Sequence, residues 1–411
     1  MGGVSSVLLL LWCRGGCSAA TVAAALTFFP PNPPCYTLKK KDDSEELELV
    51  VDEVLQSTIS TVGVRVATIR SEKGGACWNK KKSATPPSSG NPESKEKKGS
   101  ENNRGSSGAK KGNIIPLAFY PKANARYTLV YSHGNATDIG AMHDRCAGVA
   151  EAVGINVLVY DYTGYGAATG SPTEAQTYRD IEAVCAWARK HVLSEGDDGS
   201  GNKGHGLILY GQSVGSGPTC YIAGDRTKGN FAGVVLHSPI LSGMRVLTES
   251  RALSCLDIYP NVDRIARVRC PVMVMHGMKD EEVPWEHGKG MYEAVPEKYR
   301  RPPWWVPDRG HNDICEGRRH LREFYERLKA FVQSLDDETV APADPSIGVT
   351  TAGGARSGND QSRSSLEALK SRNSSKSTTE AVESTETEPN EIGPKETAGC
   401  SKSASVREEV A

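Results

Sequence analysis

The stretch Gly211-Gln212-Ser213-Val214-Gly215 decides the fold of this chain. It follows a continuous apolar run, residues 206–210 (GLILY), which is typical of a buried strand. Small residues after it open an expected helix. A strand, a sharp turn with Ser at its apex and a helix together predict a nucleophile elbow. The two flanking glycines favour such a turn, because a strained backbone leaves no room for neighbouring Cβ atoms.

Other apolar runs predict further strands around this elbow. They cover residues 157–160, 233–236 and 272–275, and a helical pattern lies between two of them at about 174–191. Strands that alternate with helices require a mostly parallel sheet with helices on both faces, so the chain is predicted to adopt the α/β-hydrolase fold. About thirty residues lie between 236 and 271, which leaves no room for a large lid domain.

An acid and a base follow Ser213 in the order that this fold requires, which is Ser, then Asp or Glu, then His. Asp280 comes just after the strand that ends at residue 275, and His311 follows an expected short strand at 304–306. Functional loops gather at the carboxyl ends of parallel strands. A Ser hydroxyl needs a base to become a nucleophile, and the carboxylate would orient the imidazole and stabilise its charged form.

Rival side chains exist for these roles. Glu281 and Asp308 are alternative acids, although neither is placed as well after a strand as Asp280. His133, His237 and His276 are expected to be structural. The spacing of Cys and His residues suggests no metal site, so we predict no metal ligand in this chain.

An oxyanion hole is predicted from the loop after another apolar strand, residues 127–131. In this fold the tetrahedral oxyanion is held by a backbone N–H of that loop and by the N–H of the residue after the nucleophile. These donors are expected to be the backbone N–H groups of Asn135 and Val214.

Five sequence blocks occur together and in order: SHGNA (132–136), YDYTGYG (160–166), LYGQSVG (209–215), LHSPILSG (236–243) and GHNDI (310–314). With them the chain resembles the α/β-hydrolase domain-containing protein 17 family, membrane-tethered serine hydrolases that remove palmitate from protein cysteines. The resemblance covers roughly residues 113–335 and implies that Ser213 is the nucleophile, Asp280 the acid and His311 the base. It also implies that the substrates are S-palmitoylated membrane proteins and that the enzyme needs no cofactor.

The chain is predicted to have three parts. Residues 1–41 are expected to be a lipid-anchor segment, 42–335 the hydrolase domain, and 336–411 a disordered tail rich in Ser, Thr and Glu. Within the domain, 42–70 is expected to form a helix and then a strand. A disordered insertion at about 71–112 would lie at the tip of a hairpin, since it lacks apolar residues to bury.

The N-terminus indicates lipidation. Its first residues fit the N-myristoylation pattern with Gly2 as the acceptor. One myristoyl chain binds a membrane only marginally, so Cys13 and Cys17 are candidate palmitoylation sites for the second signal. A lipid-anchored protein on the cytoplasmic face of a membrane is therefore expected. A signal peptide or an anchor helix is the alternative, but the apolar run at 7–12 is short for either.

Composition narrows the function classes. The formal net charge is −1, which suggests no nucleic-acid partner, and the eleven scattered cysteines show no disulfide framework. We expect a monomer. The leading hypothesis is hydrolysis of S-palmitoyl-cysteine thioesters. A lipid esterase or lysophospholipase, a serine peptidase, and a catalytically silent membrane-tethered scaffold are the alternatives.

Overall fold

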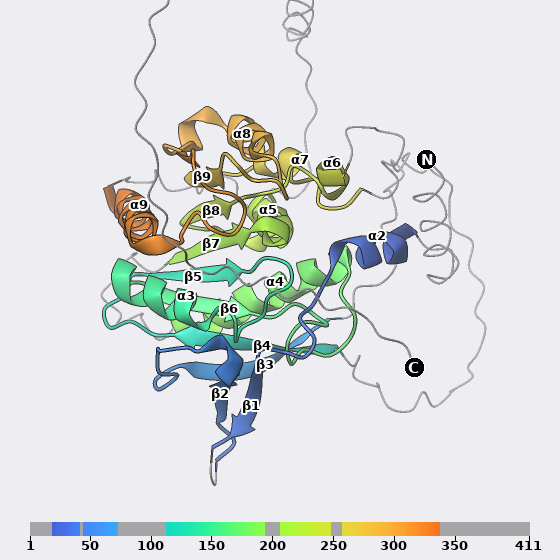
Figure 1. Ribbon diagram of the computed structural model, residues 1–411, viewed down its shortest axis with the longest axis vertical. Coiled ribbons are helices and arrows are strands. Elements are labelled where there is room, and N and C mark those ends of the chain that lie inside the picture. The colour runs from blue at the N-terminus through green and yellow to red at the C-terminus, as the bar shows by residue number, and fades with distance from the viewer. Residues whose placement is uncertain (1–18, 42–43, 73–111, 194–205, 248–256, 338–411) are drawn as a thin grey trace, which may run out of the picture. The chain divides into compact units, whose positions relative to one another are not determined.

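The computed structural model describes residues 19–41, 44–72, 112–193, 206–247 and 257–337, which belong to one compact unit (Figure 1). Within these residues the centre of the fold is one ten-stranded sheet. Its strands are β1 (Tyr36–Lys40), β2 (Leu47–Val51), β3 (Arg65–Ser71), β4 (Asn113–Tyr120), β5 (Tyr127–Ser132), β6 (Asn156–Tyr160), β7 (Gly206–Gln212), β8 (Gly233–His237), β9 (Val272–Gly277) and β10 (Trp304–Val306).

The strands lie in the order β1-β2-β3-β4-β6-β5-β7-β8-β9-β10. The first four strands and β6 pair antiparallel along one side of the sheet, and every pair from β6 to β10 is parallel. The carboxyl ends of β5, β7, β9 and β10 therefore meet at one edge, with β7 near the middle. The prediction of a mostly parallel α/β-hydrolase sheet is confirmed.

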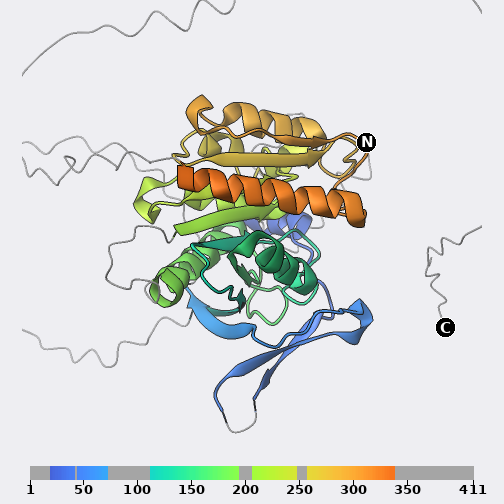
Figure 2. The same cartoon turned by 90° about the vertical axis from the view of Figure 1, so that its left-hand side faces the viewer.

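Helices cover both faces of this sheet because the inner strands are apolar on both sides. In β7, Leu207 and Leu209 pack into one core cluster, and Ile208 and Tyr210 pack into the other. Figure 2 looks at the face that carries α3 and α9. The helices are α2 (Ala19–Thr27), α3 (His143–Val149), α4 (Glu174–Ala188), α5 (Ser216–Ala223), α6 (Gly243–Leu247), α7 (Asn261–Ile265), α8 (Trp285–Ala294) and α9 (Gly317–Asp337).

The predicted hairpin around the long insertion is present. Strands β3 and β4 pair antiparallel in continuous register, from Arg65 opposite Phe119 to Ser71 opposite Asn113. The two strands that flank the insertion are thus paired with each other. Residues 73–111, and the expected tail from 338 onward, lie outside the described residues. The helical pattern predicted at about 174–191 is confirmed by α4.

The helix predicted at the start of the 42–70 segment is wrong. Strand β2 runs through it instead, followed by a short 3-10 turn, Glu53–Leu55. Leu47, Leu49 and Val51 recur every second residue, which is the period of a strand, and β2 pairs along its whole length with β1. The apolar alternation, reinforced by this pairing, makes the segment a strand.

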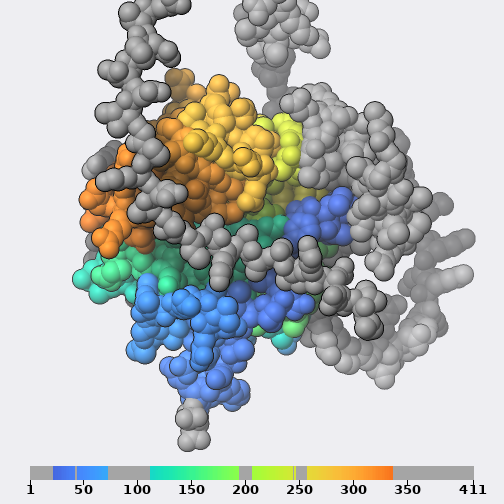
Figure 3. All heavy atoms as spheres, viewed as in Figure 1, coloured from blue at the N-terminus to red at the C-terminus, as the bar shows by residue number. Residues whose placement is uncertain are grey.

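The expected boundary at residue 41 is also wrong, because part of the predicted anchor segment belongs to the folded unit. Helix α2 and strand β1 precede this boundary, and Val22, Phe28 and Tyr36 are buried. In the space-filling view α2, in dark blue, is part of the surface (Figure 3). Among the described helices, none combines the length and the apolar character needed to cross a bilayer.

Phe28 ties this N-terminal segment to the core. Its ring packs edge-on against Tyr165 at 6.5 Å and against Tyr259 at 6.2 Å between ring centroids. We expect Phe28→Ala to lower the free energy of unfolding by about 3 kcal/mol or more, since it leaves a cavity among buried rings. Phe29→Ala is the matched control, because Phe29 is 55% exposed and should cost less than about 1 kcal/mol. Urea unfolding of both variants measures the difference, and equal losses would contradict this account of α2.

Candidate active site

Ser213 lies at the apex of a strained turn between β7 and α5. A 3-10 turn, Ser213–Gly215, joins the two elements, and Ser213 has a φ of 51°. Positive φ is unfavourable for a residue with a Cβ and persists only where the surroundings enforce it. A Cβ on Gly215 would lie 2.1 Å from the carbonyl oxygen of Ser132, and one on Gly211 would lie 2.8 Å from that of Gly215. The predicted nucleophile elbow is therefore present, and its flanking glycines are required sterically.

The structure brings Asp280 and His311 to this serine. The Ser213 Oγ and the His311 Nε2 are 2.9 Å apart, and the His311 Nδ1 lies 2.6 Å from the Asp280 Oδ2. His311 and Asp280 are both buried. The hydroxyl can thus donate to the ring nitrogen while the opposite N–H donates to the carboxylate. This is the geometry that general-base activation of a serine requires.

Asp280 is held as a carboxylate. Its Oδ1 accepts hydrogen bonds from the backbone N–H groups of Glu282 (3.0 Å) and Val283 (2.7 Å). Burial by itself would raise the pKa of Asp280, but hydrogen bonds from His276 and His311 outweigh it and hold the pKa well below its ordinary value. The acid therefore stays ionised beside the imidazole.

His276 is a site residue that the sequence analysis missed. Its fully buried Nε2 lies 3.0 Å from the Asp280 Oδ2 and 2.8 Å from the carbonyl oxygen of Val283. Since both neighbours are acceptors, this nitrogen carries the proton. His276 is the last residue but one of β9 and stands four residues before Asp280, and that spacing near a strand end was the available signal. The expectation that His276 is merely structural is corrected: it contacts the acid directly.

The rival acids lie elsewhere. Asp308 is exposed and pairs with the His320 Nε2 at 3.3 Å, and Glu281 is exposed. Glu282, which the sequence analysis did not consider, comes within 4.0 Å of the His311 Nε2, but its side chain is 65% exposed. Only a buried, directly bonded carboxylate can fix the imidazole, so Asp280 fills that position.

The other two histidines have structural surroundings. His133 is fully buried against the ring of Tyr162, and its Nδ1 lies 2.8 Å from the carbonyl oxygen of Gly134. The Nδ1 of His237 lies 2.8 Å from the Tyr210 hydroxyl, and burial holds its pKa well below the ordinary value. Neither bonds to the Ser213–His311 pair.

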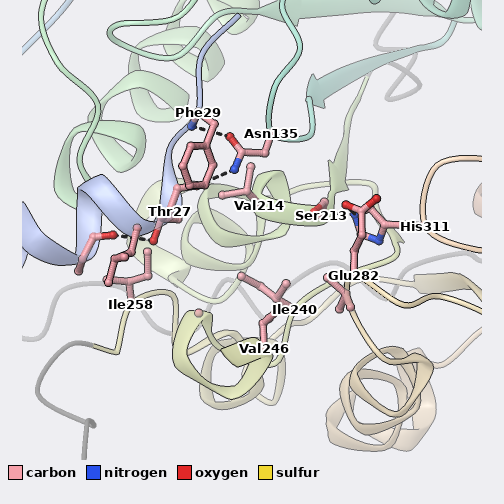
Figure 4. Close-up of a pocket in the computed structure, with 14 residues that line it drawn as sticks. Thr27, Phe29, Asn135, Ser213, Val214, Ile240, Val246, Ile258, Glu282 and His311 are labelled. Atoms are coloured by element: carbon pink, nitrogen blue, oxygen red, sulfur yellow. Dashed lines mark hydrogen bonds and ion pairs between the residues drawn. The ribbon is translucent and has the colours of Figure 1, made fainter. Parts of the chain in front are cut away.

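Asn135 and Val214, whose N–H groups were predicted to form the oxyanion hole, line one cavity with Ser213 and His311 (Figure 4). The Asn135 side chain fixes the loop that carries it. Its Nδ2 donates to the carbonyl oxygen of Thr27 (2.6 Å), and its Oδ1 accepts from the N–H of Phe29 (2.9 Å) and the hydroxyl of Tyr165 (2.6 Å). The cavity thus joins the serine, the base and both expected donors.

The predicted lipidation residues Gly2, Cys13 and Cys17 lie outside the described residues. Among the residues that are described, no group of three Asp, Glu, His or Cys side chains is arranged to hold a metal ion.

We expect His276→Phe, which keeps an aromatic ring at this position but removes the N–H, to lower kcat for an activated short-chain ester by about tenfold or more. Asp280 would then be held by fewer donors. The loss should stay below the roughly 10⁴-fold effect typical of replacing the acid of such a triad by its amide. His276→Gln retains an N–H near the Nε2 position and should recover most of the rate. A His276→Phe enzyme with unchanged kcat would contradict this role.

The same variant changes the pH dependence of stability. A carboxylate with a lowered pKa stabilises the fold above its unfolded pKa, about 4, and this contribution disappears as the pH falls towards the folded value. Removing the His276 N–H brings the folded pKa of Asp280 nearer to the unfolded one. The free-energy difference between wild type and His276→Phe should therefore be larger at pH 7 than at pH 3.

Known proteins resemble this chain in the region of the site. A family model described as "Serine aminopeptidase, S33" matches residues 123–259. The human alpha/beta hydrolase domain-containing protein 17B is 39% identical over 54% of this chain and 72% of its own length. The Xenopus laevis protein 17C is 41% identical over 51% of this chain and 62% of its own length.

Among solved structures, an esterase of Pyrococcus furiosus is similar over 54% of this chain and 88% of its own, with 16% identity and a TM-score of 0.43. The match to the human protein is 39% identical and covers 72% of that protein, which is enough to assign the family. This chain belongs to the alpha/beta hydrolase domain-containing protein 17 family.

Proposed function

We propose that this hydrolase cleaves S-palmitoyl-cysteine thioesters of membrane-associated proteins. The observation that carries the proposal is the hydrogen-bonded series from Ser213 through His311 to the buried carboxylate of Asp280. It opens into a cavity whose lining is largely apolar. A nucleophile, a base and an apolar cavity are together suited to transferring an acyl chain from a leaving group to water.

The reaction follows from this geometry. The Ser213 Oγ attacks the thioester carbonyl while the His311 Nε2, 2.9 Å away, takes its proton. The N–H groups of Asn135 and Val214 stabilise the oxyanion. The cysteine sulfur then leaves with the proton from His311, and an acyl ester remains on Ser213. Water, deprotonated by the same nitrogen, attacks that ester, and the fatty acid and the serine hydroxyl are released.

Three features support a working enzyme over a silent scaffold. The carboxylate is ionised, the imidazole is bonded on both nitrogens, and Ser213 is kept in a strained conformation. Strain of this kind costs free energy and persists at functional sites. An oxygen-ester lipase would use the same groups, so the choice of thioester rests on the family resemblance and is tested by substrate.

We expect a fluorophosphonate probe to label the wild-type protein at Ser213 and not the Ser213→Ala variant. Hydrolysis of a palmitoylated cysteine peptide should fall by more than about 10³-fold in that variant, because the nucleophile of a triad has effects of this size. The peptide assay, run beside one with monoacylglycerol, separates thioesterase from lipase. An aminoacyl amide substrate tests the peptidase alternative. Wild-type hydrolysis by Ser213→Ala would refute the mechanism.

We also propose that the protein is attached to the cytoplasmic face of a membrane through Gly2 and through Cys13 or Cys17. A single myristoyl chain gives marginal binding, so two lipids are needed for stable attachment. Gly2→Ala should move most of the protein from the membrane to the soluble fraction of cells, and Cys13→Ser with Cys17→Ser should do the same. Unchanged fractionation of the triple variant would contradict lipid anchoring.

A further inference from the structure

The catalytic cavity extends from Ser213 to the N-terminal helix. Figure 4 shows Ser213 and His311 at one end and Thr27 and Ile258 at the other. Its volume is about 190 Å³, below the roughly 300 Å³ at the lower end of drug-sized ligand sites. Only the methylenes nearest the carbonyl of a long acyl chain therefore fit inside this cavity, and the rest of the chain has to extend beyond it.

That wall is apolar and comes from several elements. Val214, Ile240, Ile258 and Val283 are buried in the same core cluster and line the cavity. The carboxylate of Glu282 lies at the end that carries His311 (Figure 4). The described residues that line the remainder include no charged side chain, so a charged group there would lose its hydration without gaining a counter-charge. The lining therefore selects a hydrocarbon chain.

Helix α2 closes the end of the cavity away from the serine. Ala23, Leu26 and Thr27 from this helix line it, and so does Phe29 just beyond. Phe29 is 55% exposed, which is unusual for an aromatic ring beside an apolar cavity. An exposed ring at this position can cover the part of a chain that extends past the cavity.

The helix is also fastened to the oxyanion loop. Thr27 is the last residue of α2, and its carbonyl oxygen accepts from the Asn135 side chain at 2.6 Å. The N–H of Phe29 donates back to the same side chain at 2.9 Å. Carbonyl groups at helix ends lack helical partners, so this bond satisfies one of them and fixes α2 at a defined position. A single amide, the Asn135 side chain, therefore fixes both the end of α2 that lines the cavity and the loop that carries the expected oxyanion donor.

We propose that α2, together with Phe29 just after it, is the acyl-selecting element of this enzyme, with Leu26 and Phe29 as the residues that favour long chains. The proposal rests on the proposed acyl hydrolysis and names the part of the substrate that the helix contacts. The ligand is the saturated chain of a fatty acyl thioester, bound with its carbonyl at Ser213 and its methylenes against Leu26 and Phe29.

The experiment compares acetyl and palmitoyl thioesters of one cysteine peptide. Leu26→Trp fills the far end of the cavity and should lower the ratio of kcat/KM for palmitoyl over acetyl by about tenfold or more, a size typical of added bulk in an apolar pocket. Ala25→Trp is the matched control, because Ala25 is on the same helix but is exposed and outside the lining. The control should leave the ratio unchanged.

A second variant guards against misfolding. Phe29→Ala removes an exposed ring and keeps the backbone bond to Asn135, so it should fold normally and lower the palmitoyl-to-acetyl ratio severalfold. Fluorophosphonate labelling of Ser213 in each variant shows that the machinery is intact. If Leu26→Trp and Phe29→Ala are labelled and keep the wild-type ratio, α2 does not select the chain. If the wild type is not labelled, the proposed function itself fails, and the proposal fails with it.

Discussion

The close approach of the elbow to strand β5 is the constraint on which the rest of the site depends. The missing Cβ of Gly215 allows the turn after Ser213 to lie against the carbonyl oxygens of Ser132 and His133, and these residues lead into the loop that carries Asn135. The same contact therefore places the nucleophile at positive φ and brings the two expected oxyanion donors into one cavity. A side chain at residue 215 would separate them.

Close to this turn, the buried negative charge of Asp280 is stabilised by hydrogen-bond donors in direct contact with it. Asp280 is the carboxylate, and its two oxygens receive hydrogen bonds from two backbone N–H groups and two imidazoles. Removing a carboxylate from water is unfavourable unless such donors replace the water. His237, close by, has its pKa lowered by burial and stays neutral. The site therefore holds a fixed negative charge that favours a proton on His311 during the reaction.

The sequence predicted those parts of the site that follow from position along a strand. Ser213, Asp280 and His311 each lie in the turn or loop that follows an apolar strand, and the edge of a parallel sheet gathers such residues. His276 had its place near the end of β9 as its one signal in the sequence. Its bond to Asp280, like the role of α2, depends on which side chain a folded neighbour meets. Asn135 was expected for its backbone N–H alone. Its amide bonds to Thr27 and Phe29, more than a hundred residues away, become visible only in the folded chain.

These two kinds of residue divide the work of the enzyme. The sheet and elbow supply chemistry that any acyl group undergoes, since attack, oxyanion binding and proton transfer involve only atoms near the carbonyl. Selection of one acyl chain over another requires contacts further along it, and those come from α2, before the first strand. Leu26 and Phe29 lie on a segment separate from β7 and α5, so a substitution there can change chain selection without disturbing the elbow. The single amide of Asn135 limits that freedom, because a helix that shifts its end also shifts the loop that carries the expected oxyanion donor.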